Sequence, residues 1–96
     1  MELFIFARFH AREGQEAALL AALRDEVGPS RAEPSCLAHA AYRCVRDPRL
    51  FWIHSRWVDE AAFESHAELE HTLRFVERVQ PLIDHPLDVT RTRAIT

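Results

Sequence analysis

His66 is the residue of this chain best placed for proton transfer. Apolar residues recur at steps of three, four and seven over residues 62–83, which is the spacing of one helix face, and His66 is the polar interruption of that stripe. We therefore expect its imidazole to point toward the core. An imidazole titrates near neutrality and suits an acid, a base or a substrate-orienting group in a small pocket. The alternative is a core histidine hydrogen-bonded to a backbone carbonyl.

His71 follows five residues after His66. On an unbroken helix the two side chains would lie about 140° apart around the axis and would not share a face. A helix break near residues 68–70 would instead turn His71 inward. The spacing is also not the three or four residues of a helical metal-ligand pair. The other histidines add no such spacing (His10, His39, His54 and His85). The sequence therefore predicts no metal site.

Two aromatic residues are candidates for the wall of a pocket. Trp57 ends a predicted strand and shares a strand face with Ser55 and Ile53. Tyr42 lies on the preceding predicted strand, and we expect its phenol in the same layer. The alternative for both residues is simple packing in the core.

Composition excludes several classes of protein. A chain of 96 residues has room for one domain, residues 1–96, and its net charge of −3 argues against a nucleic-acid partner. All 12 basic residues are arginines, so there is no lysine for a Schiff base or a P-loop. Two glycines are too few for a phosphate-binding loop. We expect no bound cofactor.

The two cysteines indicate a reducing compartment. Cys36 and Cys44 lie eight residues apart in one predicted strand, which places them about 26 Å apart. A disulfide needs Cα atoms within about 7 Å of each other. We expect free thiols and a cytoplasmic protein. No stretch approaches the roughly 20 apolar residues of a membrane span.

The expected elements follow the order strand, helix, strand, strand, helix, strand. Hydrophobic periodicity and turn residues predict strands at residues 3–10, 37–45, 50–58 and 87–95. The first predicted helix spans residues 15–27 and is ended by Gly28-Pro29. The second begins after the N-cap candidate Asp59 and runs from residue 60 to Pro81. This is the α+β, ferredoxin-like βαββαβ order, with a four-stranded antiparallel sheet and two helices on one of its faces.

The first and third predicted strands are apolar on both faces. On the first strand, Phe4 and Phe6 point to one face and Leu3 and Ile5 to the other. On the third strand, Trp52 points to one face and its neighbours Phe51 and Ile53 to the other. Helices on one side of the sheet leave the other face uncovered. We expect a second copy of the chain to cover it in a two-fold homodimer, with a monomer as the alternative.

Five segments together resemble the antibiotic biosynthesis monooxygenase (ABM) family of the dimeric α/β-barrel superfamily. They are FARFHAREG at 6–14, RAEPSCL at 31–37, YRCVRDP at 42–48, LFWIHSRWVDEAAFESH at 50–66 and EHTLRFVERVQPL at 70–82. The resemblance covers nearly the whole chain. It implies a dimer with a pocket between the sheet and the helices of each subunit.

The resemblance also implies a reaction. Some members oxidise small phenolic, quinol or polyketide-like aromatic substrates with O₂ and without metal or flavin. By position, His66, His71, Trp57 and Tyr42 match pocket or common aromatic positions of the family. These four residues are the expected catalytic set.

Two departures from the family pattern bear on function. Ser55 stands where members often have a glutamate two residues before the tryptophan, and Val76 stands where haem-degrading relatives have a histidine ligand. Haem degradation is therefore not expected. Two other functions stay open: an isomerase-like small-molecule enzyme, which the two histidines would also suit, and a non-catalytic ligand-binding stress-response dimer.

Overall fold

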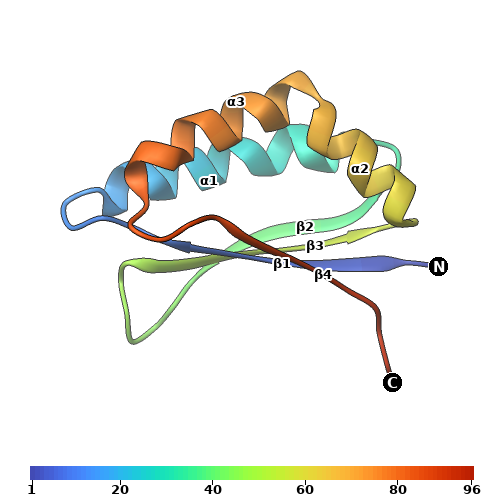
Figure 1. Ribbon diagram of the computed structural model, residues 1–96, viewed down its shortest axis with the longest axis horizontal. Helices are drawn as coiled ribbons and strands as arrows, with labels where there is room; N and C mark the ends of the chain where they lie inside the picture. The colour runs from blue at the N-terminus through green and yellow to red at the C-terminus, as the bar shows by residue number, and fades with distance from the viewer.

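The computed structural model describes residues 1–96 as one sheet covered by helices on a single face (Figure 1). In chain order the elements are β1 (Leu3–His10), α1 (Glu16–Arg31), β2 (Cys36–Arg43), β3 (Leu50–Trp57), α2 (Glu60–Glu68), α3 (Glu70–Val79), the 3-10 turn η1 (Gln80–Leu82) and β4 (Asp88–Thr92). All strand pairs are antiparallel, in the order β2-β3-β1-β4. The ferredoxin-like prediction is confirmed.

Alternation along the central strands sets which side chains face the helices. On β3, Phe51, Ile53, Ser55 and Trp57 are buried and their neighbours are not. The β1 residues that pair with them are buried in the same way. The apolar core forms two clusters, a larger one around Phe9, Leu19 and Phe51 and a smaller one made by Leu3, Ile5, Trp57 and Phe63.

The first helix is longer than predicted. It passes through Gly28 and Pro29 and ends at Arg31. Proline inside a helix removes one hydrogen bond and crowds the preceding turn, but the last turn of α1 is held by tertiary contacts. Ser30 is fully buried, and Arg31 Nε donates a hydrogen bond to the carbonyl oxygen of His39 on β2 at 2.8 Å. These contacts outweigh the local stop signal.

The second helical region breaks at Leu69, where the backbone is extended with ψ of 148°. α2 and α3 therefore bury different faces, and the predicted continuous stripe is wrong at Leu69 and Leu73, although Ile83 at its end is buried. Leu69 and Leu73 are exposed, whereas Thr72 and Val79 are buried. A break in this segment was the condition for turning His71 inward.

Two further predictions concern the cysteines and the membrane. Both Cys36 and Cys44 are free, as expected from their spacing, although β2 ends one residue before Cys44. No helix combines the length and the apolar character needed to cross a bilayer.

Candidate active site

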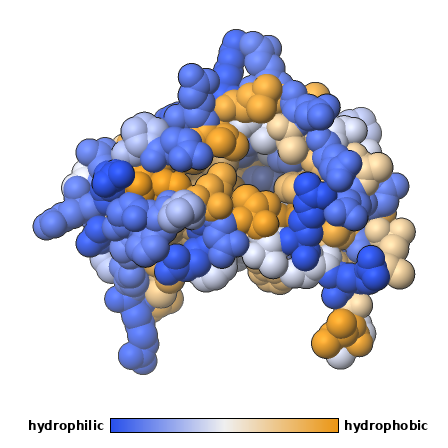
Figure 2. Space-filling model, in the orientation of Figure 1, coloured by the Kyte–Doolittle hydropathy of each residue, from blue (hydrophilic) through white to orange (hydrophobic).

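A cavity of about 260 Å³ lies between the sheet and the helices. Most of its lining is apolar and comes from both core clusters, from α3 and from β4. Figure 2 shows a hollow with apolar residues around it between the helical layer and the sheet. Five lining residues are polar: Glu26, His39, Ser55, His66 and Thr72. A mostly apolar pocket with a few convergent polar groups is typical of a small-molecule site.

His66 lies in the cavity wall, as expected, and its side chain is oriented by a carboxylate. Its Nδ1 is 2.6 Å from Oε2 of Glu33, and Thr72 Oγ1 lies 3.4 Å from the same nitrogen. The other ring nitrogen, Nε2, makes no hydrogen bond to the protein. A carboxylate on one nitrogen selects the tautomer that leaves a lone pair on the other. The arrangement therefore presents Nε2 as a proton acceptor.

Trp57 lies against His66 and is not itself part of the cavity wall. Its ring centroid is 4.4 Å from that of the imidazole, and its side chain is completely buried. Its Nε1 donates a hydrogen bond to Ser55 Oγ at 3.0 Å. Because the indole is held in this way, its face forms a rigid support for His66. The serine that replaces the expected glutamate thus satisfies the indole N–H.

The break at Leu69 brings His71 into the same polar cluster. His71 Nε2 is 2.9 Å from Glu33 Oε2, and its Nδ1 is 2.6 Å from Oε1 of Glu26. The four side chains form one chain of contacts in the order His66, Glu33, His71, Glu26. We call this chain the His–Glu relay.

Sequence reasoning missed both glutamates of the relay. Glu26 carried a usable signal, because it lies on the buried face of α1 together with Leu19, Ala22 and Leu23. A carboxylate on such a stripe needs a partner. Glu33 lies in the loop after α1, outside any periodic element, and only the folded chain brings it to the two histidines.

Burial and pairing give the two histidines opposite shifts. Burial lowers the pKa of His66, and the hydrogen bond to Glu33 offsets only part of this effect. Burial also acts to lower the pKa of His71, but the hydrogen bonds to Glu26 and Glu33 outweigh it, so the net pKa is raised. Burial raises the pKa of Glu26. These opposite shifts favour the neutral imidazole at the cavity and the imidazolium behind it.

His39 is a polar residue of the cavity wall that the sequence did not single out. It faces the helices from β2, directly across from Ser55, and its side chain is almost completely buried. Its Nδ1 has no hydrogen-bond partner. Burial, together with His66 when it is protonated and the positive charge of Arg31, lowers the pKa of His39 to about 4. It is therefore a neutral imidazole with an unpaired nitrogen.

The expectation that Tyr42 shares the layer of Trp57 is wrong. Tyr42 is 56% exposed and does not line the cavity. Its partner across the strand pair is Trp52, so both point to the open face of the sheet. Adjacent residues of a strand point to opposite faces, and the observed register gives the inward positions of β2 to His39 and Ala41.

The structure also brings together possible metal ligands that spacing could not reveal. Ligand atoms of Glu33, His66 and His71 lie within 4.8 Å of one another, and so do those of His10, Asp84 and His85 at the end of the sheet. Each set draws on separate elements of the chain. The spacing of histidines within one helix cannot reveal a set of ligands that comes from different elements.

The fold and the cavity define a small ferredoxin-like protein with a histidine-containing pocket between sheet and helices. The family model described as "Antibiotic biosynthesis monooxygenase" matches residues 3–78. The chain belongs to this family, as its sequence motifs indicated.

Individual relatives agree with this assignment. The Bacillus subtilis protein "Putative monooxygenase YcnE" is 36% identical over 63 residues, and the match spans 66% of this chain and 66% of that relative. The Mycobacterium tuberculosis structure Rv0793 has a TM-score of 0.94 at 25% identity and covers 100% of this chain and 97% of its own. The Pseudomonas aeruginosa structure PA3566 has a TM-score of 0.91 at 33% identity, and the match covers 99% of this chain and 95% of that one. The family and the name of the Bacillus subtilis relative support a monooxygenase-like function.

Proposed function

We propose that the protein is a cofactor-independent monooxygenase that oxidises a small phenolic, quinol or polyketide-like aromatic compound with O₂. One observation carries the proposal. The Nε2 of His66 is unpartnered at an apolar cavity, while Glu33 holds the opposite nitrogen of the same ring. This is the geometry of a general base with an orienting carboxylate.

The proposed reaction begins with proton abstraction. His66 Nε2 removes a proton from the substrate, at a phenol or at a CH₂ group flanked by aromatic rings, and Glu33 stabilises the imidazolium that forms. The resulting carbanion or phenolate is electron-rich and reduces O₂. For a CH₂ group, one oxygen atom enters the substrate as a carbonyl and the other leaves as water with the two hydrogens. For a hydroquinone, two electrons and two protons pass to O₂, which gives the quinone and hydrogen peroxide. The apolar wall keeps other water away from the anion.

The remaining polar residues support this role. The raised pKa of His71 favours its protonated form beside Glu33, and this positive charge in turn favours the ionised carboxylate that His66 needs. His39 and Thr72 add an imidazole and a hydroxyl to the cavity wall, as groups that can hydrogen-bond an oxygen of the substrate. Trp57 is a positioning residue in this scheme, because it contacts His66 and not the cavity.

Glu33→Gln tests the orienting role. The amide cannot stabilise the imidazolium of His66, so we expect the rate of O₂ consumption with hydroquinone or anthrone to fall at least ~10-fold, short of the full contribution of a general base. Oxygen uptake is measured with an electrode, and product by absorbance. The control is Glu68→Gln, an exposed carboxylate at the end of α2, which should leave the rate unchanged.

Two outcomes would contradict the proposal. Equal O₂ uptake in Glu33→Gln and the wild-type protein would remove the orienting role. Turnover of a phosphorylated carbonyl compound without O₂ uptake would instead favour an isomerase-like enzyme, which uses the same base.

We further propose that the protein is a homodimer formed through the open face of the sheet. Phe6 and Tyr42 are 43% and 56% exposed on this face and, with Trp52 and His54, form a shallow apolar depression. We expect the same face of a second copy to pack here, because a two-fold axis places the same aromatic patch of both subunits in contact. The sequence resemblance implies the same arrangement.

Phe6→Arg should convert the dimer to a monomer. In size-exclusion chromatography with light scattering, the wild-type protein should have twice the chain mass of 11.1 kDa and the variant a mass of 11.1 kDa. A charge buried without a partner opposes association. Leu73→Arg places the same charge on an exposed leucine of α3, on the helical side, and should remain dimeric. A wild-type mass of 11.1 kDa would refute the dimer.

A further inference from the structure

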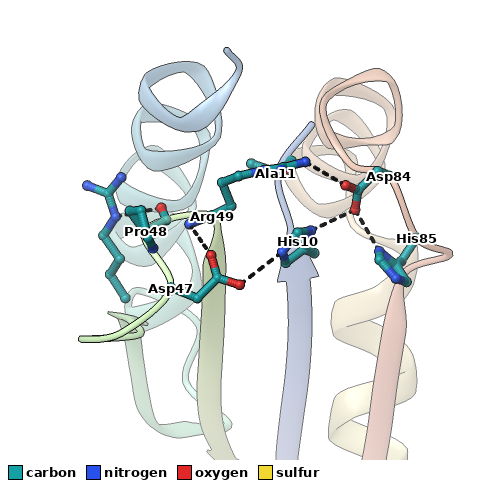
Figure 3. Close-up of polar contacts among 8 residues, drawn as sticks. His10, Ala11, Asp47, Pro48, Arg49, Asp84 and His85 are labelled. Atoms are coloured by element: carbon teal, nitrogen blue, oxygen red, sulfur yellow. Dashed lines mark hydrogen bonds and ion pairs between the residues drawn. The ribbon is translucent and has the colours of Figure 1, made fainter. Parts of the chain in front are cut away.

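A second cluster of titratable side chains lies outside the cavity, where three segments of the chain meet (Figure 3). His10 ends β1, while Asp84 and His85 lie in the connection between η1 and β4. Nδ1 of His10 and Nδ1 of His85 are 2.8 Å and 2.6 Å from the same oxygen, Oδ1 of Asp84. The two rings are nearly perpendicular, at 78°, with centroids 5.3 Å apart. Two imidazole nitrogens and one carboxylate oxygen thus converge on one point.

The cluster has an outer shell that orients two of these ligand groups. Nε2 of His10 is 3.1 Å from Oδ2 of Asp47, in the turn between β2 and β3. Arg49 Nη2 donates a hydrogen bond to the other oxygen of Asp84 at 2.9 Å. A metal-bound histidine usually donates its second ring N–H to a carboxylate, and a metal-bound carboxylate is itself hydrogen-bonded. Both features are present here.

Main-chain hydrogen bonds hold the cluster independently of its side chains. The N–H of Asp84 donates to the carbonyl oxygen of His10 at 3.0 Å, and that of Arg12 donates to Leu82 at 2.8 Å. Arg49 Nε donates to the carbonyl oxygen of Ala11 at 2.9 Å. His10 and Asp84 are therefore fixed relative to each other by rigid backbone, as a preorganised ligand pair requires.

We propose that His10, Asp84 and His85 form a binding site for a divalent transition metal ion of the zinc class. Two imidazoles and one carboxylate suit zinc, cobalt or nickel better than magnesium or calcium, which prefer oxygen ligands. With both histidines neutral, Asp47 and Asp84 outweigh Arg49 by one negative charge, so the site attracts a cation. Ligand atoms around a tetrahedral zinc ion lie about 3.3 Å apart, so the contacts of His10 and His85 with Asp84, at 2.8 Å and 2.6 Å, would lengthen as the ion binds.

The metal would take the place of the hydrogen bonds between the two imidazoles and Asp84. Binding would therefore link β1 to the η1–β4 connection. His85 is 57% exposed at its side chain, so water completes the coordination sphere from the solvent side. The site shares no residue with the cavity, and its role is to stabilise this end of the sheet.

Zinc binding to the tag-free full chain tests the site. After treatment with a chelator, the protein is titrated with ZnCl₂ against a chromophoric zinc indicator, and Co²⁺ is added separately to record its visible absorption bands. We expect one ion per chain and a higher Tm with zinc. His85→Ala, which removes a ligand, should weaken binding at least 10-fold, and Asp47→Asn should weaken it about 10–100-fold through the outer shell.

His66→Gln separates this site from the other candidate ligand set. Unchanged zinc affinity in this variant supports the proposal, since His66 belongs to the His–Glu relay. Loss of binding in His66→Gln but not in His85→Ala would overturn it, and so would the absence of stoichiometric binding to the wild-type protein. Neither result depends on whether the protein proves to be an oxygenase.

Discussion

His66→Gln is expected to lower the rate of O₂-dependent turnover of hydroquinone or anthrone by roughly 100–10,000-fold, which is the usual contribution of a general base. Glutamine keeps a polar side chain in the cavity wall but cannot accept the proton that the imidazole Nε2 takes. Glu33, on the opposite side of the ring, loses the imidazole that it orients and keeps only its contact with His71. The loss should appear in kcat, with a smaller change in KM.

The pH dependence gives an independent readout of the same role. The rate in the wild-type protein should fall as pH drops through the pKa of His66, because the protonated imidazole is not a base. Burial lowers this pKa, so activity should persist below pH 6.5, the ordinary value for histidine. His66→Gln should lack this acid limb. A variant with wild-type kcat and an unchanged profile would remove His66 from the mechanism.

The free energy of unfolding is expected to fall by about 3 kcal/mol between pH 6.5 and pH 4 through His39 alone. The pKa of His39 is about 4 in the folded protein, against 6.5 for the unperturbed group, and each unit corresponds to about 1.4 kcal/mol. Above pH 6.5 the residue is neutral in both states. Between pH 6.5 and pH 4, His39 binds a proton in the unfolded chain but stays neutral in the folded protein. The free energy of unfolding therefore decreases as pH falls. Below pH 4 both states are protonated and the loss is complete.

Comparison with His39→Gln isolates this contribution, because the other titrating groups stay the same in both proteins. Urea unfolding at pH 4, 5, 6 and 7 should give a steeper loss of stability in the wild-type protein than in the variant. Parallel pH profiles for the two proteins would show that His39 is not held neutral in the fold.

Local patterns were sufficient for much of the architecture. β1 has the predicted bounds, since a short apolar run rich in aromatic residues indicates a strand without reference to the rest of the chain. Asp59 caps α2 as predicted, with Oδ1 accepting a hydrogen bond from the N–H of Ala62 at 2.8 Å. The position of His66 on an otherwise apolar face placed it correctly in the core.

Other features depended on contacts between distant segments. The stop signal at Gly28-Pro29 was overridden because the last turn of α1 is anchored on β2. The side of the sheet on which Tyr42 lies follows from strand register, and a shift by one residue exchanges the two faces. The apolar periodicity did not determine which face of α3 is buried, because one extended residue, Leu69, changes the direction in which the whole helix presents its side chains.

The amino-acid sequence by itself determined the ferredoxin-like order of elements, the family and the histidine at the centre of the candidate site. Each rests on local periodicity or on motifs contiguous in the chain. The tertiary structure alone decided what surrounds that histidine. Glu33 lies 33 residues from His66, and Asp84 lies 74 residues from His10. Such pairs are made by the packing of separate elements, and spacing along the chain does not encode them.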